Sequence, residues 1–459
     1  MDISNRNTIN IKDRNVTIIG LARSGVAAAK LAHELGANVF ISDRGEPKEE
    51  LIQLNKLGIQ GEISGHSEKV YEADLWVISP GVPKESEIIL KAQSKKIPVV
   101  GEIEFASWFT HAPLLAITGS NGKTTTAHML YEMCKTDDIH PILSGNVGNA
   151  FSEVVLNDLS QPDEKRVHIL EISSFQMEFI NHFRPYISLF LNLTQDHLNR
   201  YKDMDDYVSA KMNMWSNQTE DDFLVFNADD ALLTNRIGPA KAMTIPFSLG
   251  SDIDGLLFRL NATKIFDDQE HATLINLDKI ALPGRHNLSN YLGSSTSASL
   301  LGIASSRIAQ VMSTFCGVPH RLEHVGEINS VTYINDSKAT NVDAVKVALD
   351  SIENPVLLIL GGRDKGGDFR SLTPHTHNKV KETLTIGESE KAIASVLEDA
   401  VRLTSCGSLK NAVEVAHSHA QPGDVVLLSP GCASFDQFAN FEERGDTFRE
   451  LVQGLKVHG

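Results

Sequence analysis

The stretch that most constrains the fold of this 459-residue chain is residues 114–126, which read LLAITGSNGKTTT. A short apolar run leads into a glycine-rich turn, followed by Lys123-Thr124 and by a helix-compatible segment at 127–134. Glycines allow several backbone N–H groups to point at one anion, and the start of a helix adds partial positive charge. The pattern predicts a phosphate-binding loop between a buried strand and a helix.

The chemistry of this loop depends on two side chains and on one departure from the ordinary spacing. Lys123 is placed to reach the outer phosphates of a nucleotide, and the Thr124 hydroxyl is placed to bind Mg²⁺. Ile117 stands where the ordinary motif has its first glycine, so we interpret the loop as a shortened variant. The alternative is a glycine-rich turn with an incidental lysine, which the flanking strand and helix disfavour.

Length and composition exclude several classes of protein. The length predicts roughly three domains, and 41% hydrophobic with 22% charged residues fits a soluble globular enzyme. The net charge of −17 argues against a general affinity for nucleic acid or an anionic membrane. The four cysteines have no ligand-like spacing, and neither a signal peptide nor a membrane span is evident. We expect a cytoplasmic protein without nucleic-acid or membrane partners, and a monomer.

The first hundred residues show the pattern of a dinucleotide-binding fold. An expected strand at 16–19 is followed by Gly20-Leu21-Ala22-Arg23-Ser24-Gly25 and an alanine-rich helix, and a second strand at 37–41 ends near Asp43. Ala22 replaces the middle glycine, and its Cβ would crowd a pyrophosphate lying tight on the turn. NAD is therefore a weak prediction, a nucleotide-sugar diphosphate fits as well, and a turn without a ligand stays open.

In the middle of the chain, polar residues follow expected strands directly. Glu171 follows the strand at 167–170, His197 lies just after the strand at 187–193, and an expected helix at 207–214 carries Lys211. Ligands bind at the carboxyl ends of strands in open α/β sheets, so we expect Lys123, Glu171 and His197 on one edge. Glu171 and His197 could bind Mg²⁺ either directly or through its water ligands. The alternatives are that Glu171 caps the end of a strand and that His197 is a packed imidazole.

Two asparagines open another expected helix. Asn287 and Asn290 are three residues apart and share one helix face. They suit a ligand-facing role, although asparagine is also common where a helix begins.

The last third of the chain repeats the pattern of strands with polar, glycine-rich ends. Strands expected at 331–334, 356–360 and 425–428 are followed by loops with Lys338, Thr340, Lys365 and Ser434. Such side chains suit the carboxylates of a small acid, although each lysine could equally be a solvated surface charge. We place domain boundaries to give domains at 1–101, 102–317 and 318–459.

Together these stretches resemble the Mur ligase family, the ATP-dependent amide-forming enzymes of peptidoglycan synthesis. TGSNGKTTT at 118–126, EISSFQ at 171–176, TQDH at 194–197 and HNLSN at 286–290 are similar to motifs of the family's central domain. PHRLE at 319–323, NDSKATN at 335–341, LGGRDKG at 360–366 and SPGCASFDQF at 429–438 resemble the D-glutamate-adding branch. The resemblance implies three α/β domains: a Rossmann-like one, a P-loop ATPase-like one and a second Rossmann-like one.

The resemblance also implies substrates, cofactors and residue roles. The substrates are ATP, D-glutamate and UDP-N-acetylmuramoyl-L-alanine, with two Mg²⁺ ions, a carbamate on Lys211, and Lys123, His197 and Lys211 as the catalytic residues. The implied ATP contacts are Gly119, Asn121, Gly122, Lys123, Thr124, Thr125, Asn287, Asn290, Arg321 and Asp336. The implied Mg²⁺ ligands are Thr124, Glu171, His197 and Lys211. The implied UDP-sugar contacts are Ser24, Asp43, Ser79, Gly81, Asn146 and Ser173. The implied D-glutamate contacts are Lys338, Thr340, Lys365, Ser434 and Phe435.

Three other readings remain open at this point. An NAD-dependent dehydrogenase would use residues 16–44 but has no use for Lys123, and a nucleotide-binding switch has no use for Lys365 or Ser434. Within the ligases, the alternative is another amino-acid-adding member of the family or a folylpolyglutamate synthase.

Overall fold

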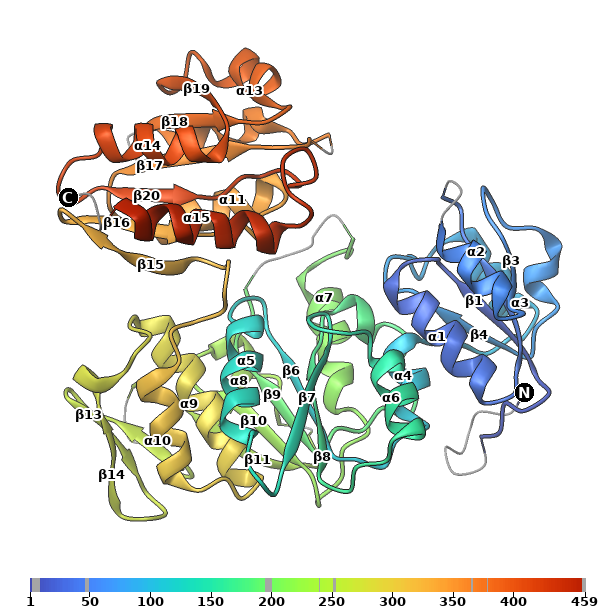
Figure 1. Ribbon diagram of the computed structural model, residues 1–459. Helices are drawn as coiled ribbons and strands as arrows, with labels where there is room; N and C mark the ends of the chain where they lie inside the picture. Colours follow the sequence, from blue (N-terminus) through green and yellow to red (C-terminus); the bar gives the residue numbers. More distant parts are fainter. Residues whose placement is uncertain are drawn as a thin grey trace. The chain divides into compact units, whose positions relative to one another are not determined.

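The computed structural model describes residues 1, 9–45, 49–194, 200–238, 240–250, 253–364, 366–377 and 379–455. These residues form two compact units, 1–315 and 316–459 (Figure 1). Both units are built from mostly parallel sheets with helices against their faces, which confirms the predicted α/β class. The boundaries predicted at 101 and 317 stay predictions. Among the described residues, no helix is both long and apolar enough to span a bilayer.

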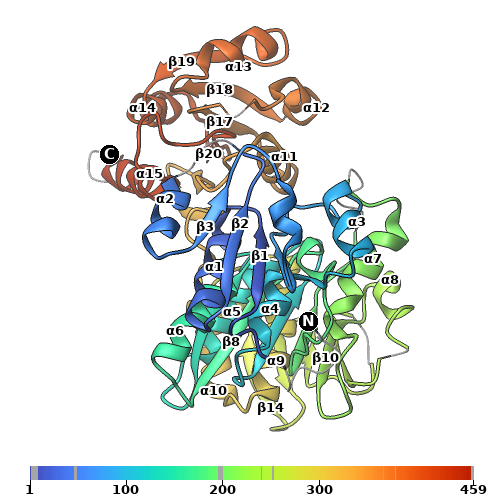
Figure 2. The same cartoon turned by 90° about the vertical axis from the view of Figure 1, so that its right-hand side faces the viewer.

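The N-terminal sheet is parallel with the strand order β3-β2-β1-β4-β5. The alanine-rich face of α1 packs along β1 and β2, because small side chains let the helix approach the sheet closely (Figure 2). The strand order changes direction between β1 and β4, and ligands of open α/β sheets bind beside such a point. The elements are β1 Asn15–Ile19, α1 Arg23–Glu34, β2 Asn38–Ser42, α2 Glu49–Lys56, β3 Gln60–Glu62, η2 Glu68–Tyr71, β4 Leu75–Ile78, α3 Glu87–Ser94, β5 Val99–Gly101 and α4 Glu102–Ser107.

The central sheet is also parallel, with the order β11-β10-β9-β6-β8-β7. All residues of β6 are buried, and α5 and α9 lie side by side on one face of the sheet (Figure 1). The elements are β6 Leu114–Thr118, α5 Lys123–Cys134, β7 His140–Gly145, α6 Phe151–Ser160, β8 Arg166–Glu171, η3 Phe175–Met177, β9 Ile187–Phe190, α7 Met204–Met212, η4 Asn213–Trp215, β10 Phe223–Asn227, α8 Ala231–Thr234, β11 Met243–Phe247, η5 Leu277–Lys279, α9 Arg285–Leu300 and α10 Ser305–Thr314.

One hydrophobic core joins the first two sheets into a single unit. It contains Ile18 and Leu31 from the N-terminal sheet and its helix, Phe105 from α4, and Leu170 and Phe190 from the central sheet. Side chains that share a core in this way hold the two sheets in a fixed relation within residues 1–315.

Two features of the central region differ from the sequence-based expectation. The strand expected at 187–193 ends at Phe190, because beyond it Leu191 and Asn192 bond to the phosphate loop, with Ser120 N–H donating to Asn192 O at 3.0 Å. The antiparallel sheet of β12 Phe258–Leu260, β13 Lys264–Asp267 and β14 Ala272–Asn276 was not expected. Its strands are short and carry polar residues, so their hydrophobic alternation is weak.

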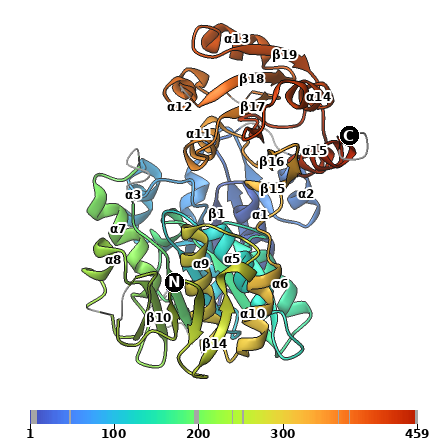
Figure 3. The ribbon, with the colours of Figure 1, turned by 90° about the vertical axis from the view of Figure 1, so that its left-hand side faces the viewer.

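The second unit contains a sheet with the order β15-β16-β20-β17-β18-β19, in which the β15–β16 pair is antiparallel and the other pairs are parallel. Alternate residues of β17 face opposite sides: Leu358 shares a core with residues of α11 and α13, and Leu357 shares one with residues of α14 and α15. Figure 3 shows α11 and α13 at one side of the sheet and α14 and α15 at the other. The elements are β15 Glu323–Ile328, β16 Val331–Asn335, α11 Val342–Ser351, β17 Val356–Gly361, η6 Phe369–Leu372, α12 Thr373–Thr376, β18 Val380–Ile386, α13 Glu390–Leu397, β19 Leu403–Gly407, α14 Leu409–His419, β20 Val425–Leu428 and α15 Phe441–Leu455.

Candidate active site

The phosphate loop connects β6 to α5, as the sequence predicts. Gly119 and Gly122 have φ values of 154° and 82°, which L side chains rarely adopt, and Gly122 is the N-cap residue of α5. A Cβ at Gly122 would lie 2.5 Å from Oδ1 of Asn290, so the α9 asparagine abuts the loop. The loop is held in place because Asn121 N–H donates to Asn192 Oδ1 at 2.8 Å.

Two lysines bring their ammonium groups to this loop. Lys123 Nζ donates to the carbonyl oxygens of Gly119 and Ser120, both at 2.9 Å. Lys211 comes from α7, is only 2% exposed, and donates from Nζ to Gly119 O at 3.0 Å and to Thr118 Oγ1 at 3.3 Å. Two cations that share one carbonyl oxygen repel each other, so the arrangement favours an anion beside them.

Glu171 ends β8 on the same edge of the sheet and is 2% exposed. Its Oε1 accepts a hydrogen bond from Asn146 Nδ2 at 2.7 Å, and its Oε2 is buried with no partner in the described structure. A buried carboxylate oxygen without a donor is costly unless a cation or water satisfies it. Within the described ranges, no group of three or more His, Cys, Asp and Glu residues could hold a metal, and His197 lies outside those ranges.

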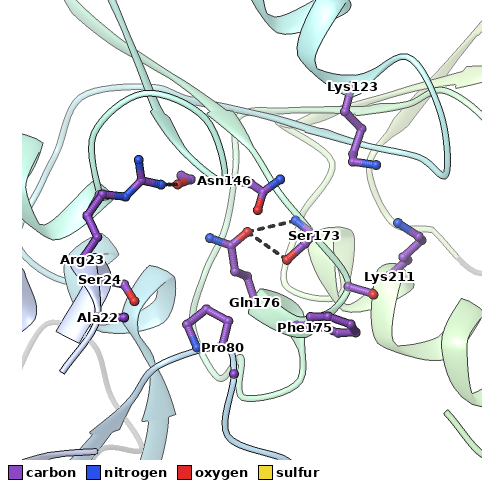
Figure 4. Close-up of a pocket in the computed structure, with 14 residues that line it drawn as sticks. Ala22, Arg23, Ser24, Pro80, Lys123, Asn146, Ser173, Phe175, Gln176 and Lys211 are labelled. Atoms are coloured by element: carbon purple, nitrogen blue, oxygen red, sulfur yellow. Dashed lines mark hydrogen bonds between the residues drawn. The ribbon is translucent and has the colours of Figure 1, made fainter. Parts of the chain in front are cut away.

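A cavity of about 430 Å³ opens beside the two lysines, entirely within residues 1–315 (Figure 4). Its lining includes Ser24 and Gly81 from the N-terminal sheet and Asn146 and Ser173 from the central sheet, four of the six residues expected at a UDP-sugar. The charged side chains among its described lining residues are Arg23, Lys123 and Lys211, with no carboxylate. The full lining is Ala22, Arg23, Ser24, Pro80, Gly81, Lys123, Gly145, Asn146, Ala150, Ser173, Ser174, Phe175, Gln176 and Lys211.

The other two residues expected at the UDP-sugar support the glycine-rich turn of the first sheet. Asp43 accepts hydrogen bonds from the backbone N–H groups of Leu21, at 2.5 Å, and Gly45, at 2.6 Å. Ser79 Oγ lies 3.5 Å from both Ser24 Oγ and Gly20 O. Neither is among the described residues that line the cavity.

Sequence reasoning assigned no role to three of the polar residues that line the cavity, Arg23, Ser174 and Gln176. Gln176 accepts hydrogen bonds at Oε1 from the N–H, at 2.9 Å, and the hydroxyl, at 3.1 Å, of Ser173. Its place five residues after Glu171, in the polar segment behind a buried strand, was an available signal. Arg23 had a weaker signal, its position directly after the glycine-rich turn.

The α9 asparagines expected at ATP are both buried. Asn287 Nδ2 donates to Pro283 O at 2.7 Å, which braces the turn before α9, whereas Asn290 reaches the phosphate loop. Thr124 is buried at the start of α5, and Thr125 is half-buried.

In the second unit, the loops after β16, β17 and β20 meet at the carboxyl edge of the sheet. Arg363 exchanges backbone hydrogen bonds with Ala433 at 2.9 and 3.0 Å, which joins the loop after β17 to the loop after β20. Fully buried Arg444 donates to Ser337 Oγ at 2.9 Å and to Cys432 O at 3.1 Å, which joins the loops after β16 and β20. Burial lowers the pKa of Arg444 to about 10, so it remains charged at neutral pH.

The residues expected at D-glutamate and at ATP in this unit differ in exposure. Ser434 is buried, Phe435 is 59% exposed, and Lys338 and Thr340 are half-buried. Lys365 lies outside the described residues.

Asp336 is buried at the end of β16, while Arg321 is exposed. Asp336 accepts hydrogen bonds from Ser429 Oγ at 2.8 Å and Leu322 N–H at 3.2 Å. Burial raises its pKa to about 6.

Three family models match the chain in succession. Residues 14–101 match the Mur ligase MurD-like N-terminal domain, residues 117–298 the Mur ligase middle domain, and residues 320–432 the Mur ligase glutamate ligase domain.

Curated relatives match over nearly the full length. The UDP-N-acetylmuramoylalanine–D-glutamate ligase of Salinibacter ruber is 41% identical, over 97% of this chain and 99% of its own. The enzyme of the same name from Christiangramia forsetii is 38% identical, over 96% of this chain and 100% of its own.

Solved structures share the fold at lower identity. The UDP-N-acetylmuramate-alanine ligase of Thermotoga maritima superposes with a TM-score of 0.55 at 20% identity, covering 96% of this chain and 99% of its own. The MurF ligase of Thermotoga maritima gives a TM-score of 0.54 at 15% identity, covering 98% of this chain and 97% of its own. The succession of domains and the identity over nearly the whole length show that this chain belongs to the Mur ligase family.

Proposed function

We propose that this enzyme uses ATP to join D-glutamate to the alanyl carboxylate of UDP-N-acetylmuramoyl-L-alanine. The observation that carries the proposal is a phosphate loop with two lysines that opens on a cavity whose described charged residues are all cations. In a chain of net charge −17, such a cavity is a local site for anionic substrates. The named relatives at 38–41% identity, and the match to a glutamate ligase domain, supply the choice of amino acid.

The proposed reaction proceeds in two steps. The alanyl carboxylate attacks the γ-phosphate of ATP, which gives an acyl phosphate and ADP. The neutral amine of D-glutamate then attacks the acyl carbon, and the tetrahedral intermediate loses phosphate, which takes up the proton released by the amine, to leave the amide. Carboxylate, γ-phosphate and ADP are all anionic, so positioning and charge stabilisation account for most of the catalysis.

The residues around the loop have distinct parts in this reaction. Lys123 holds the γ-phosphate and follows its charge during transfer, and the backbone N–H groups of the loop hold the other phosphates. Asn290 fixes the loop at Gly122, and Asn287 braces the turn before α9. The cavity holds the UDP-sugar with its alanyl carboxylate turned toward the two lysines.

The site suits two Mg²⁺ ions and a modified lysine. The unpartnered Oε2 of Glu171 fits a cation, and Thr124 and His197 are proposed as further ligands. Bound Mg²⁺ would screen the charges of the phosphates and the attacking carboxylate. A carbamate on Lys211 would replace one of two neighbouring cations by an anion, which relieves their repulsion and adds a further oxygen ligand.

The second unit is proposed to select the amino acid. Its three loops converge at one sheet edge, and they carry Lys338, Thr340, Ser434 and Phe435. These four residues and Lys365 are proposed to hold D-glutamate. Two carboxylates need fixed cations and donors, because burying an unpaired carboxylate is costly. The ATP contacts proposed for Arg321 and Asp336 lie in the same unit.

Phosphate release by the purified full chain tests the proposal. The assay contains ATP, Mg²⁺, UDP-N-acetylmuramoyl-L-alanine and one of a panel of D- and L-amino acids. We expect release with D-glutamate and little with L-glutamate or with D-alanine. Preference for an L-amino acid would reject D-glutamate and leave a different Mur-type ligase, and a requirement for NAD instead of ATP would reject the ligase.

A further inference from the structure

Arg23 connects the two sheets of the first unit across the cavity. It is the first residue of α1, and its guanidinium donates from Nη2 to Gly145 O at 3.2 Å and from Nη1 to Gly148 O. Gly145 is the last residue of β7, and Gly148 lies in the loop that follows, which also carries Asn146, the partner of Glu171. One side chain therefore ties the glycine-rich turn of the N-terminal sheet to a loop of the central sheet.

The charge of Arg23 is not matched by its partners. Carbonyl oxygens accept hydrogen bonds but carry no net charge. Arg23 also lines a second cleft with Glu50 and Glu153, but among the described residues it forms no ion pair with a carboxylate. A guanidinium has five N–H donors, of which the two carbonyls use two. Arg23 is exposed where it lines the cavity, so its remaining charge and N–H donors are accessible to an anion bound there.

The position of Arg23 indicates which anion that is. Lys123 and Lys211 lie together at one side of the cavity, and Arg23 lies at the other side beside Ala22 and Ser24 (Figure 4). The proposed UDP-sugar has anionic groups at two places, the alanyl carboxylate and the diphosphate. Because the carboxylate must lie near the two lysines to react, the diphosphate lies toward Arg23.

We propose that Arg23 binds the diphosphate of the nucleotide-sugar substrate and that, by bridging to Gly145 and Gly148, it couples this contact to the loop that positions Asn146. The inference rests on the proposed function. The start of α1, with the N–H groups of its first turn, adds partial positive charge beside the guanidinium. Ala22 stands in place of a glycine, and its Cβ keeps the diphosphate away from the backbone of the turn. Arg23 thus supplies part of the binding that the turn itself cannot.

Binding measurements on the full-length enzyme test the inference. If Arg23 only bridges the two loops, its replacement should affect all ligands alike, whereas a contact to the diphosphate should affect only ligands that contain phosphate. Affinities for UDP-N-acetylmuramoyl-L-alanine and UDP are measured by calorimetry, and that for uridine by competition. We expect Arg23→Leu to lower the affinity for the two ligands that contain a diphosphate by about 10- to 150-fold, the usual effect of losing a hydrogen bond to a charged group. Uridine, which lacks phosphate, should lose little affinity, and Arg23→Lys should fall between the parent and Arg23→Leu.

A matched control and the contrary outcomes complete the test. Lys30 lies on the same helix but is not among the described residues that line the cavity, so Lys30→Leu should leave all three affinities unchanged. If Arg23→Leu lowers the affinities for UDP and uridine equally, or lowers neither, the inference about Arg23 is wrong and the proposed function still stands. Failure of the parent enzyme to bind the UDP-sugar would overturn the proposed function as well. Thermal unfolding of each variant shows whether it is folded, and Arg23→Lys keeps the test open if Arg23→Leu is not.

Discussion

At the scale of single residues, the candidate site is governed by charged groups that lie close together at the phosphate loop. Lys123 and Lys211 both donate to Gly119 O, and Glu171 keeps a buried oxygen without a donor in the described structure. Such arrangements cost stability in the empty protein and are offset when ligands of opposite charge bind.

Replacing Lys123 by alanine should remove a contact that strengthens as the γ-phosphate is transferred. By analogy with other donors to developing charge, worth about 2.7–4 kcal/mol, the loss in kcat should be about 10²-fold or more. Steady-state phosphate release measures it, and Lys135→Ala, at the exposed far end of α5, is the control. Turnover of Lys123→Ala within a few-fold of the parent would reject the assignment.

Activity should depend on CO₂ if Lys211 carries a carbamate. Enzyme depleted of CO₂ should lose activity and regain it with bicarbonate. Lys211→Ala should be inactive and partly rescued by a short-chain carboxylic acid, which supplies the missing oxygen ligands. Lys202→Ala, an exposed lysine just before the same helix, should need no rescue. An unmodified Lys211 in fully active enzyme, measured by mass spectrometry, would contradict the carbamate.

His168 should make the protein sensitive to acid. Its side chain is buried against Phe151, and burial first, then the charge of Arg166, lowers its pKa from 6.5 to about 4, despite Asp158 Oδ2 at 3.4 Å. The unfolded chain therefore binds the proton more readily, and stability is lost as pH falls from 6.5 toward 4. Between pH 7.5 and 5.5 this amounts to about 1.4 kcal/mol.

Urea unfolding at the two pH values measures this loss. His168→Gln should remove that part of the pH dependence, because glutamine takes up no proton. The matched change His33→Gln, at an exposed position on α1, should leave the acid sensitivity in place. An unchanged slope in His168→Gln would show that other groups cause it.

At the scale of elements, strands with polar ends could be predicted because two signals coincide there. The runs at 16–19, 331–334, 356–360 and 425–428 are apolar and short, and glycine or polar residues follow them directly. The small sheet β12–β14 lacks the first signal, because polar residues interrupt the apolar runs of its strands.

Individual site residues were harder to predict than the strands. Arg23 lines the cavity while bonding to Gly145 and Gly148, which are distant in sequence, and no local pattern records such contacts. Gln176 bonds locally to Ser173, so its place after a buried strand was the signal available for it. His197 and Lys365 lie outside the described residues, so the roles predicted for them stay predictions.

Arg444 should determine whether the loops after β16 and β20 keep their places. Arg444→Leu leaves Ser337 and the Cys432 carbonyl without their buried donors, which should cost about 1–3 kcal/mol or more. Arg449→Leu, one turn along α15 with a partly exposed ion pair to Glu323, should cost about 1 kcal/mol or less. Denaturant unfolding compares them, and the KM for D-glutamate should rise in Arg444→Leu. Equal stability of the two variants would contradict this role.

At the scale of the whole molecule, the division into two units follows from the hydrophobic cores. The clusters that contain Phe105, Leu130 and Trp76 lie within residues 1–315, and those that contain Leu358 and Leu357 lie within residues 316–459. Because each unit buries its own apolar surface, each has what independent folding requires.

A chain shortened to residues 1–315 should therefore fold and bind UDP-N-acetylmuramoyl-L-alanine without catalysing its ligation. All described lining residues of the cavity lie within this range, so the affinity should stay within about threefold of that of the full chain. Amide formation should be absent, because the residues proposed to hold D-glutamate all follow residue 316. Circular dichroism and thermal unfolding check the fold, and calorimetry measures the affinity. A folded fragment with affinity reduced by about tenfold or more would show that UDP-sugar binding also needs the second unit.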